Sequence, residues 1–518
     1  MESKIILAKN IKMDKNYTNV LDYTEEQMLQ LINNNLVASA DNYTFIDNTK
    51  AYILAGFTYR QCMQANYVAF QNPDYANKWY FAFIDDIKYI DDGNVQINFS
   101  VDVWSTWFSY WTTNSCYVLR EHVNDDIAGN YTQPEGLELG EYVCNNIVET
   151  TEMNTLVVIM QVTKSTTGED ILATNYGGVW SAGGAYVCEN ISQLVNIIQS
   201  YGEGRADAII QVYLVPKCFV KNTDDTLRYE GQDTPLYLQK TINKPQNING
   251  YVPKNKKLLT FPYCYLNVSN NNGTTNSYAY ELFNNDGILP ENQVSFNIKG
   301  VPVVGGSIKC CPYQYKCGQE NNNEDEGIMA GKYPTLSWSE DSYTNWLTQN
   351  AVNLSLGLAS NLVSIVGGIA SANPVGAVGG IITGSMGIAS QIGQVYEHSL
   401  VPYTAKGNTN GGDINVSSEA QGFYFYQMSI RQEYAKIIDD YFTRYGYKIN
   451  RIKVPNLTGR LYYNYIEIGS SEEIGQPSSA TAIPATAMEE INNIARKGTT
   501  IWHNHNNMGN FSLNNTIN

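Results

Sequence analysis

Charged side chains are scarce in this sequence of 518 residues, because only 16% of the positions are Asp, Glu, Lys or Arg, and there are four histidines. The 33 Lys and Arg residues are outnumbered by 50 Asp and Glu residues, so the formal net charge is -17. A protein that grips DNA or anionic lipid electrostatically needs clustered Lys and Arg to displace counterions. The composition therefore argues against that class of protein, and four histidines leave a narrow repertoire for acid–base catalysis.

The nine cysteines are an odd number and are scattered, unlike the disulfide framework of a small secreted domain. The N-terminal apolar run covers only Ile5 to Ala8, which is too short for the apolar region of a signal peptide. We therefore expect reduced thiols and synthesis in the cytoplasm. Only Cys310, Cys311 and Cys317 cluster, and they lack the nearby histidine or second Cys pair that a zinc site would need.

Sequence motifs of common enzymes are missing: no GxSxG, Walker loop, HExxH or GxGxxG stands in a supporting strand-to-helix context. The segment Glu121 to Asp126 groups carboxylates with His122 and could be a metal or hydrolytic site, but a polar turn held by Asx hydrogen bonds is favoured. His503 and His505 lie in an Asn-rich C-terminal tail and would bind a metal weakly at most. The sequence also allows a glycosidase site with paired carboxylates, because the separation of the two carboxylates is set by the fold. We expect no enzyme activity, no cofactor and no metal.

Asn, Tyr and Gly are abundant instead, with 59 Asn, 39 Tyr and 41 Gly, and these residues favour turns, strands and hydrogen-bonded protein contacts. Alternation of apolar and polar residues predicts a strand over Val95–Val103. The turn sequence Asp91 to Asn94 joins it to the aromatic run Trp79–Ile90, which predicts a β-hairpin. The fold class is therefore mainly β with a few helices, a β-rich α+β protein. Further strands are expected at Tyr117–Arg120, Thr155–Val162, Ile209–Val215, Gly422–Met428 and Leu461–Ile468.

Three helices are predicted from their ends and their periodicity. A capping box at Thr24 to Gln27 precedes the first, which contains Met28, Leu31, Ile32 and Leu36. A second follows Asn190 and stops at Gly202, and a third carries apolar residues from Ile430 to Tyr445 and ends at Gly446. Their apolar stripes are interpreted as packing surfaces. Long polar loops are expected at 243–257, 270–276, 318–326 and 407–418.

One segment of 55 residues, Ser342 to Tyr396, contains no Asp, Glu, Lys, Arg or His. Asn373-Pro374 divides its core into two stretches of about twenty residues, and a helix of that length crosses a bilayer of ~30 Å. The nine Leu, Ile and Val residues between Ala351 and Ser371 each favour insertion by about 0.3 to 0.6 kcal/mol, but Asn, Ser and Gly offset much of this. A sum near zero suits a segment that is stored in protein and enters lipid later.

Glycines recur at Gly376, Gly380 and Gly384, the spacing that lets membrane helices approach closely. An ordinary buried helical hairpin is the alternative, but glycines weaken a soluble helix by up to ~1 kcal/mol each. We therefore favour a conditional membrane-active segment. The residues expected to contact lipid are Leu354, Leu356, Leu358, Leu362, Ile365, Val366, Ile369, Pro374, Val375, Gly376, Gly380, Ile381, Ile382, Gly384, Ile388 and Ile392.

Several motifs between Tyr52 and Val143 resemble a known family. The runs WYFAFI from Trp79, DVWSTW from Asp102, REHVNDD from Arg120 and PEGLELGEY from Pro134 are similar to those of the tail knob protein, or distal tail tube protein, of small short-tailed bacteriophages. The rest of the chain is similar in layout: a variable middle, a long uncharged hydrophobic loop and then Tyr-rich strands.

The resemblance implies that six copies form a mostly β tube at the distal end of the phage tail in the virion, in contact with other tail proteins. It implies that the hydrophobic loops plug the lumen and leave it during infection, penetrate the host membrane and open a channel for the genome. Double-stranded DNA would pass without specific binding, because an acidic lumen repels it. It also makes the Glu121–Asp126 group a structural turn of the tube domain.

Four regions follow from this interpretation: a tube-forming β domain at 1–145, an inserted middle region at 146–340, the membrane-active loop at 341–412 and a C-terminal region at 413–518 that completes the tube. Two other functions stay open. A stand-alone pore-forming toxin would use the same apolar segment, and a tail-associated cell-wall hydrolase would need a cleft with paired carboxylates.

Overall fold

In a computed structural model of the chain, the chain forms two compact units. Unit 1 contains Met1–Leu139, Pro253–Leu258 and Glu433–Asn518, and unit 2 contains Gly140–Val252 and Leu259–Gln432. The chain therefore passes from one unit to the other four times. The residues that the structure describes are 3–46, 52–71, 78–153, 155–171, 173–176, 179–189, 191–201, 205, 208–220, 224–228, 237–270, 273–284, 290–300, 307–316, 326–332, 335–337, 422–478 and 483–518.

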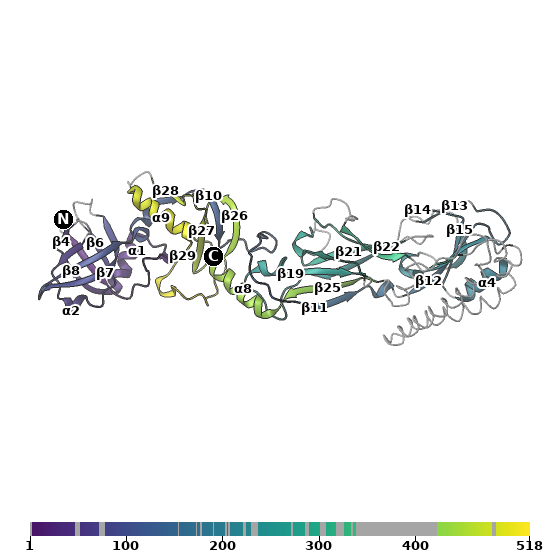
Figure 1. Ribbon diagram of the computed structural model, residues 1–518, viewed down its shortest axis with the longest axis horizontal. Coiled ribbons are helices and arrows are strands. Elements are labelled where there is room, and N and C mark those ends of the chain that lie inside the picture. The colour runs from purple at the N-terminus through teal and green to yellow at the C-terminus, as the bar shows by residue number, and fades with distance from the viewer. Residues whose placement is uncertain are drawn as a thin grey trace. The chain divides into compact units, whose positions relative to one another are not determined.

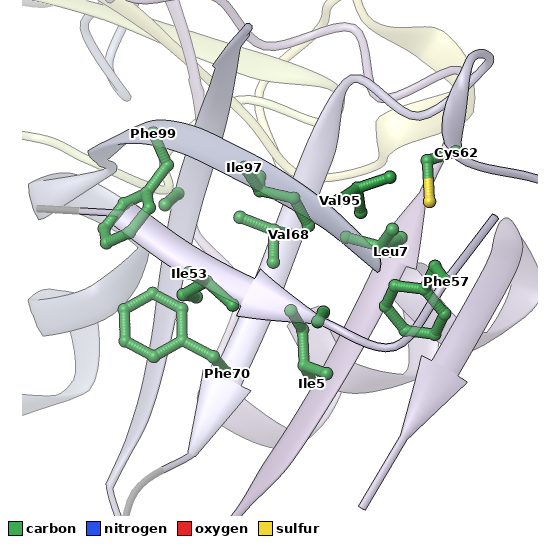
Figure 2. Packing of buried hydrophobic residues seen from close by; sticks show 12 residues of the cluster. Ile5, Leu7, Ile53, Phe57, Cys62, Val68, Phe70, Val95, Ile97 and Phe99 are labelled. Atoms are coloured by element: carbon green, nitrogen blue, oxygen red, sulfur yellow. The ribbon is translucent and has the colours of Figure 1, made fainter. Parts of the chain in front are cut away.

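A seven-stranded antiparallel sheet in unit 1 encloses a well-defined apolar cluster. Ile5 and Leu7 pack with Val95, Ile97 and Phe99, and Figure 2 shows these side chains converging on one face of the sheet. Val95, Ile97 and Phe99 alternate with polar residues, and this pattern predicts that their side chains lie on one buried face of the sheet. In spatial order the strands are β3 (Leu36–Ala40), β1 (Lys4–Ala8), β6 (Tyr67–Gln71), β7 (Trp79–Asp91), β8 (Asn94–Val101), β5 (Tyr52–Ala55) and β4 (Tyr43–Ile46).

The predicted hairpin is confirmed, because β7 and β8 pair in antiparallel register up to Asp91 and Asn94. The sequence pattern predicted that the second strand would end at Val103, but it ends at Val101. The reason is that Asp102 caps a short helix, α3 (Val103–Trp107), by accepting a hydrogen bond of 3.1 Å from the Ser105 N–H. The DVWSTW motif thus encodes a helix cap and a buried helix.

Two of the predicted helices lie mainly in unit 1. Helix α1 (Glu25–Asn34) begins after the capping box at Thr24, as predicted, although Leu36 belongs to β3 and is exposed. Helix α8 (Gln432–Tyr445) ends before Gly446, which confirms the predicted end. Not all of its predicted stripe is buried, since Ile437 is 66% exposed. The unit also contains α2 (Tyr59–Cys62), α9 (Ala485–Lys497) and the 3₁₀ turns η2 (Phe108–Tyr110) and η9 (His505–Asn507).

A five-stranded sheet joins both ends of the chain within unit 1. Its strands, in spatial order, are β2 (Asn19–Leu21), β29 (Thr499–Trp502), β27 (Tyr463–Ile468), β10 (Cys116–Glu121) and β26 (Tyr447–Lys453). Strands β2 and β29 pair in parallel, and the fully buried Trp502 ends the latter. Figure 1 shows the yellow C-terminal strand β29 beside β27. Two predicted strands, Tyr117–Arg120 and Leu461–Ile468, are confirmed here as β10 and β27, and the short strands β9 (Trp111–Thr113) and β28 (Gly475–Pro477) form a separate pair.

Unit 2 is built from β-sheets and one described helix, α4 (Ile191–Tyr201), which follows Asn190 as predicted. Its predicted strands are confirmed as β12, β16 and β25, so the mainly β fold class holds for the described residues of both units. One four-stranded sheet contains, in spatial order, β11 (Tyr142–Glu149), β25 (Tyr424–Ile430), β19 (Cys264–Ser269) and β20 (Thr275–Tyr278). A five-stranded sheet contains β17 (Asp224–Arg228), β15 (Gly184–Cys188), β12 (Leu156–Val162), β16 (Ile209–Pro216) and β24 (Thr335–Ser337). Another four-stranded sheet contains β18 (Tyr237–Asn243), β21 (Gln293–Gly300), β22 (Ser307–Pro312) and β23 (Ile328–Lys332), and β13 (Ala173–Tyr176) pairs with β14 (Val179–Ala182). The 3₁₀ turns of unit 2 are η3 (Thr151–Met153), η5 (Lys217–Phe219) and η7 (Tyr280–Leu282), while η6 (Lys256–Leu259) lies mainly in unit 1.

The glycine after α8 provides a test of how tightly this part of unit 1 is packed. Gly446 has a φ of 65°, and a Cβ atom there would lie 2.2 Å from the Glu121 carbonyl oxygen. Gly136 has a similar φ of 68° but no atom within 4 Å of the same position, so it is a matched control. Positive φ costs an alanine about 1–2 kcal/mol at either site. We predict that Gly446→Ala lowers the free energy of unfolding by at least about 2 kcal/mol more than Gly136→Ala. Urea unfolding followed by tryptophan fluorescence would measure both, and equal losses would contradict the packing described.

Candidate functional site: a buried polar network after Arg120

All sixteen residues predicted to contact lipid lie in the range 338–421, outside the described residues. The strands on either side of this range are in unit 2. Strand β24 pairs with β16, and β25 lies between β11 and β19 with Phe425 fully buried. The range thus leaves from one paired strand and returns to another. None of the helices that the structure does describe is long and apolar enough to span a bilayer.

Arg120 begins a buried ion-pair network that contains residues of the motifs carrying the family resemblance. Its guanidinium and the Lys257 ammonium both donate to the carboxylate of Glu135. Only 10% of the Arg120 side chain, 1% of Glu135 and 3% of Lys257 are exposed. A buried charge is tolerated only when it is paired and hydrogen-bonded, and this carboxylate has two cations.

Further hydrogen bonds tie the same network to the segment after α8. Arg120 donates to the Gly446 carbonyl at 2.8 Å, and the Lys448 N–H donates to Glu135 at 2.9 Å. Lys257 also donates to the Gln133 carbonyl at 2.9 Å. Segments that are far apart in the sequence are therefore fixed to one another inside unit 1.

The carboxylates predicted to form an Asx turn are held differently from the prediction. Glu121 is fully buried, pairs with Lys453 and accepts the Asn456 N–H at 2.8 Å. Asp126 accepts the Tyr447 hydroxyl at 2.6 Å and the Lys256 N–H at 3.3 Å. The segment does follow a strand, but these partners come from remote segments, because the side chains are too buried for a solvated turn.

His122 is held as a neutral ring inside this network. The Tyr465 N–H donates to its Nδ1 at 2.7 Å, so the proton lies on Nε2, which donates to the Thr443 carbonyl at 3.0 Å. Burial, and then the nearby Arg460 charge, lower the pKa of His122 to about 3. Both ring nitrogens are engaged, and a pKa of about 3 makes the ring a weak base, so His122 is poorly suited to accept a proton from a substrate.

The two C-terminal histidines are part of the folded unit and do not form a flexible tail, which corrects the sequence interpretation. Nδ1 of His503 lies 2.5 Å from an Asp22 carboxylate oxygen, and Nε2 of His505 accepts the Lys12 N–H at 3.3 Å. Pairing of β29 with β2 brings these remote residues together.

Two of the three clustered cysteines belong to the described part of the chain. Cys310 and Cys311 are buried in β22, while Cys317 lies outside the described residues. Within the ranges given above, no group of three or more His, Cys, Asp and Glu side chains has the arrangement of a metal site.

Comparison with known proteins gives the same picture as the structure. The family "Bacillus phage phi29, Tail knob protein gp9, C-terminal domain" matches residues 226–516, and "Caudoviral major tail protein N-terminus" matches residues 1–112. The chain is 24% identical to tail knob protein gp9 of Bacillus phage PZA and 22% identical to gp9 of Bacillus phage phi29, and each alignment covers 90% of both proteins. The solved structure of the bacteriophage C1 tail knob protein, gp12, has a similar fold, with a TM-score of 0.66 at 15% identity and full coverage of both chains.

A β-rich fold, a buried network of structural charges and these matches together define a structural protein of a phage tail. The chain belongs to the tail knob protein family typified by gp9 of Bacillus phage phi29. The family resemblance found in the sequence is therefore confirmed.

Loss of the Glu135 charge tests the buried network. We predict that Glu135→Gln lowers the free energy of unfolding by about 3–5 kcal/mol, because Arg120 and Lys257 would stay buried without their counter-ion. Glu138→Gln removes the same charge at an exposed position three residues away and should change stability by less than about 0.5 kcal/mol. Urea unfolding of both variants measures the difference, and a small loss for Glu135→Gln would show that the ion pairs are dispensable.

The buried histidine predicts a pH dependence of stability. A folded-state pKa of about 3, below the ordinary value of about 6.5, means that the unfolded chain binds this proton more readily between these values. His122 should then lower stability by roughly 1.4 kcal/mol for each pH unit below about 6.5, and contribute no pH dependence above it. Replacing the residue, as in His122→Gln, should remove that part of the slope between pH 4.5 and 6.5 in urea unfolding. Identical slopes for the two proteins would contradict the neutral buried ring.

Proposed function

We propose that this tail knob protein forms a ring of six copies at the distal end of the tail, through which the genome leaves the virion. The segment Ser342 to Tyr396 plugs the lumen of the ring and is released to penetrate the host membrane and form a DNA channel. The observation that carries this proposal is the segment itself, 55 residues without a charged side chain in a chain of which 16% is charged. Such a stretch has little reason to persist on a solvated loop.

The anchoring of the segment supports storage followed by release. Its range begins after β24 and ends before β25, and both strands are paired in sheets of unit 2. A loop that is fixed at both ends can leave its resting place without leaving the protein. Half of the 55 residues, fully extended at about 3.3 Å each, would reach roughly 90 Å.

The balance of charge supports a conduit. A net charge of -17 per chain gives a ring a strongly acidic surface, and an acidic lumen would let double-stranded DNA slide without specific binding. The tube itself would be built by the regions 1–145 and 413–518, with 146–340 inserted and 341–412 as the loop. The composition of unit 1 from Met1–Leu139 and Glu433–Asn518 supports a tube domain made from both ends of the chain. Other tail proteins and host lipid are the expected partners, and a purely structural role without enzyme activity is part of the proposal.

The assembly state gives the first test. Six chains of 57.9 kDa have a mass of about 350 kDa, and we predict this species by native mass spectrometry of the purified protein. A mass that stays at one chain across a range of protein concentrations would contradict the ring and favour a stand-alone toxin or a hydrolase. Turbidity loss of purified cell walls would then support the hydrolase.

Membrane activity gives the second test, with charge as the variable. Protein added to dye-loaded liposomes at neutral and mildly acidic pH should cause leakage, and deletion of Val352 to Val395 should abolish it. A double variant, Ile365→Asp with Ile381→Asp, places two charges that each cost about 2.5–3.5 kcal/mol at a bilayer centre, and should slow leakage at least tenfold. Asn410→Asp adds a charge outside the uncharged segment and serves as the control. Equal leakage from all variants, or none from the wild type together with full infectivity of the deletion, would rule the membrane role out.

A further inference from the structure

Unit 1 contains a pocket of about 310 Å³ that the function proposed above does not use. Its lining includes Arg460, Lys254, Lys256 and residues of the C-terminal segment. The lining residues all belong to unit 1, so the pocket is formed by one folded unit.

Arg460 is the unusual feature of this pocket. Only 6% of the residue is exposed, and its Nε atom is fully buried with no hydrogen-bond partner among the described residues. No carboxylate of the described part of the chain lies within ion-pair distance of its guanidinium. A buried guanidinium without a counter-ion is costly, so its retention points to a ligand that supplies the missing charge.

Two further cations stand at the same pocket. Lys254 and Lys256 are exposed, and their described hydrogen bonds use the backbone only: their N–H groups donate to Asp439 at 2.8 Å and to Asp126 at 3.3 Å. Asn255 between them is buried and donates to Asp439 at 2.7 Å, which fixes the course of this segment. Both ammonium groups can therefore turn towards a ligand from a backbone that is held in place.

The opposing charge at the pocket is smaller. Asp126 contributes one carboxylate, and it already accepts the Tyr447 hydroxyl at 2.6 Å. His122 is neutral, as shown above. Asp439 adds a second carboxylate beside the pocket, because it accepts the N–H groups of Lys254 and Asn255. Three cations against two carboxylates still make the pocket positive in a chain whose net charge is -17.

We propose that this pocket binds a phosphate group, either free phosphate or a phosphate ester on a small, flexible carrier. The guanidinium would donate to two of its oxygens, and the two lysines would neutralise the remaining charge at the rim. A carboxylate offers two oxygens and one charge, which matches three cations less well. Duplex DNA is too stiff and wide to bring a phosphate to a buried arginine, so the ligand is a small molecule or the end of a flexible polymer.

Calorimetric titration of the purified full-length protein at constant ionic strength tests the proposal. The probes are inorganic phosphate, glycerol 3-phosphate and acetate. We expect saturable binding of one phosphate probe per chain, a rise in unfolding temperature with that probe, and much weaker binding of acetate. Tighter binding of glycerol 3-phosphate than of phosphate would identify the ester as the source, and the reverse order would identify the free ion.

Variants locate the site. Arg460→Met should weaken phosphate binding at least tenfold while leaving the stability of the unliganded protein equal or higher, since an unpaired buried charge is removed. Lys497→Met removes the same charge at an exposed position of α9 and should bind as the wild type does. If Arg460→Met fails to fold, Arg460→Lys keeps the charge without the fork and should weaken binding several-fold. No saturable binding to the wild type, equal binding by the Arg460 variants, or acetate binding as tight as phosphate would overturn the assignment, and the last result would indicate an acidic protein segment as the occupant.

Discussion

The pairing of one buried carboxylate with two buried cations constrains the whole of unit 1. Glu135, with 1% of its side chain exposed, requires both Arg120 and Lys257, because a charge removed from water is stable only when it is compensated. Lys257 lies in Pro253–Leu258, the short stretch of the middle of the sequence that belongs to unit 1. The chain must therefore return to unit 1 at this point before it continues into the remainder of unit 2.

The same kind of buried pairing explains how a motif of the family can contain the residue types of a catalytic site and yet have a structural role. The sequence REHVNDD contains an imidazole and several carboxylates, which is what a hydrolytic site would need. In the structure Glu121 pairs with Lys453 of β26, and Asp126 accepts the hydroxyl of Tyr447 of the same strand. His122 is a neutral ring with both nitrogens hydrogen-bonded. These residues join remote segments of a folded unit. Catalytic groups would have to keep a free acceptor or donor for a substrate.

Local patterns predicted much of the fold. The alternation in Val95–Phe99 predicted β8, and the capping box at Thr24 predicted the start of α1, because both signals lie within a few residues. Helix α9 was missed although Pro484 precedes it and Gly498 follows it, a combination that does mark helix ends. The end of β8 was misplaced because Asp102 was counted as a polar position of a strand when it is a helix cap.

The candidate sites were less accessible to sequence reasoning. The partners of Glu121 and Glu135 at Lys453 and Lys448 lie more than three hundred residues further on, and no periodicity connects them. Arg460 stands in a polar stretch after Asn456 and Gly459, so nothing local indicates that it is buried. The uncharged segment is the opposite case, because its signal is one of composition, which the sequence shows completely.

Imaging of intact virions tests the central claim most directly. Averaged images of tails before and after genome release should show a six-fold ring at the distal end, with the lumen filled by density that a label at residues 342–396 assigns to this segment. After release the lumen should be open and the label should lie in the membrane. A ring of another symmetry, or a label on the outer surface of the tail in both states, would contradict the account.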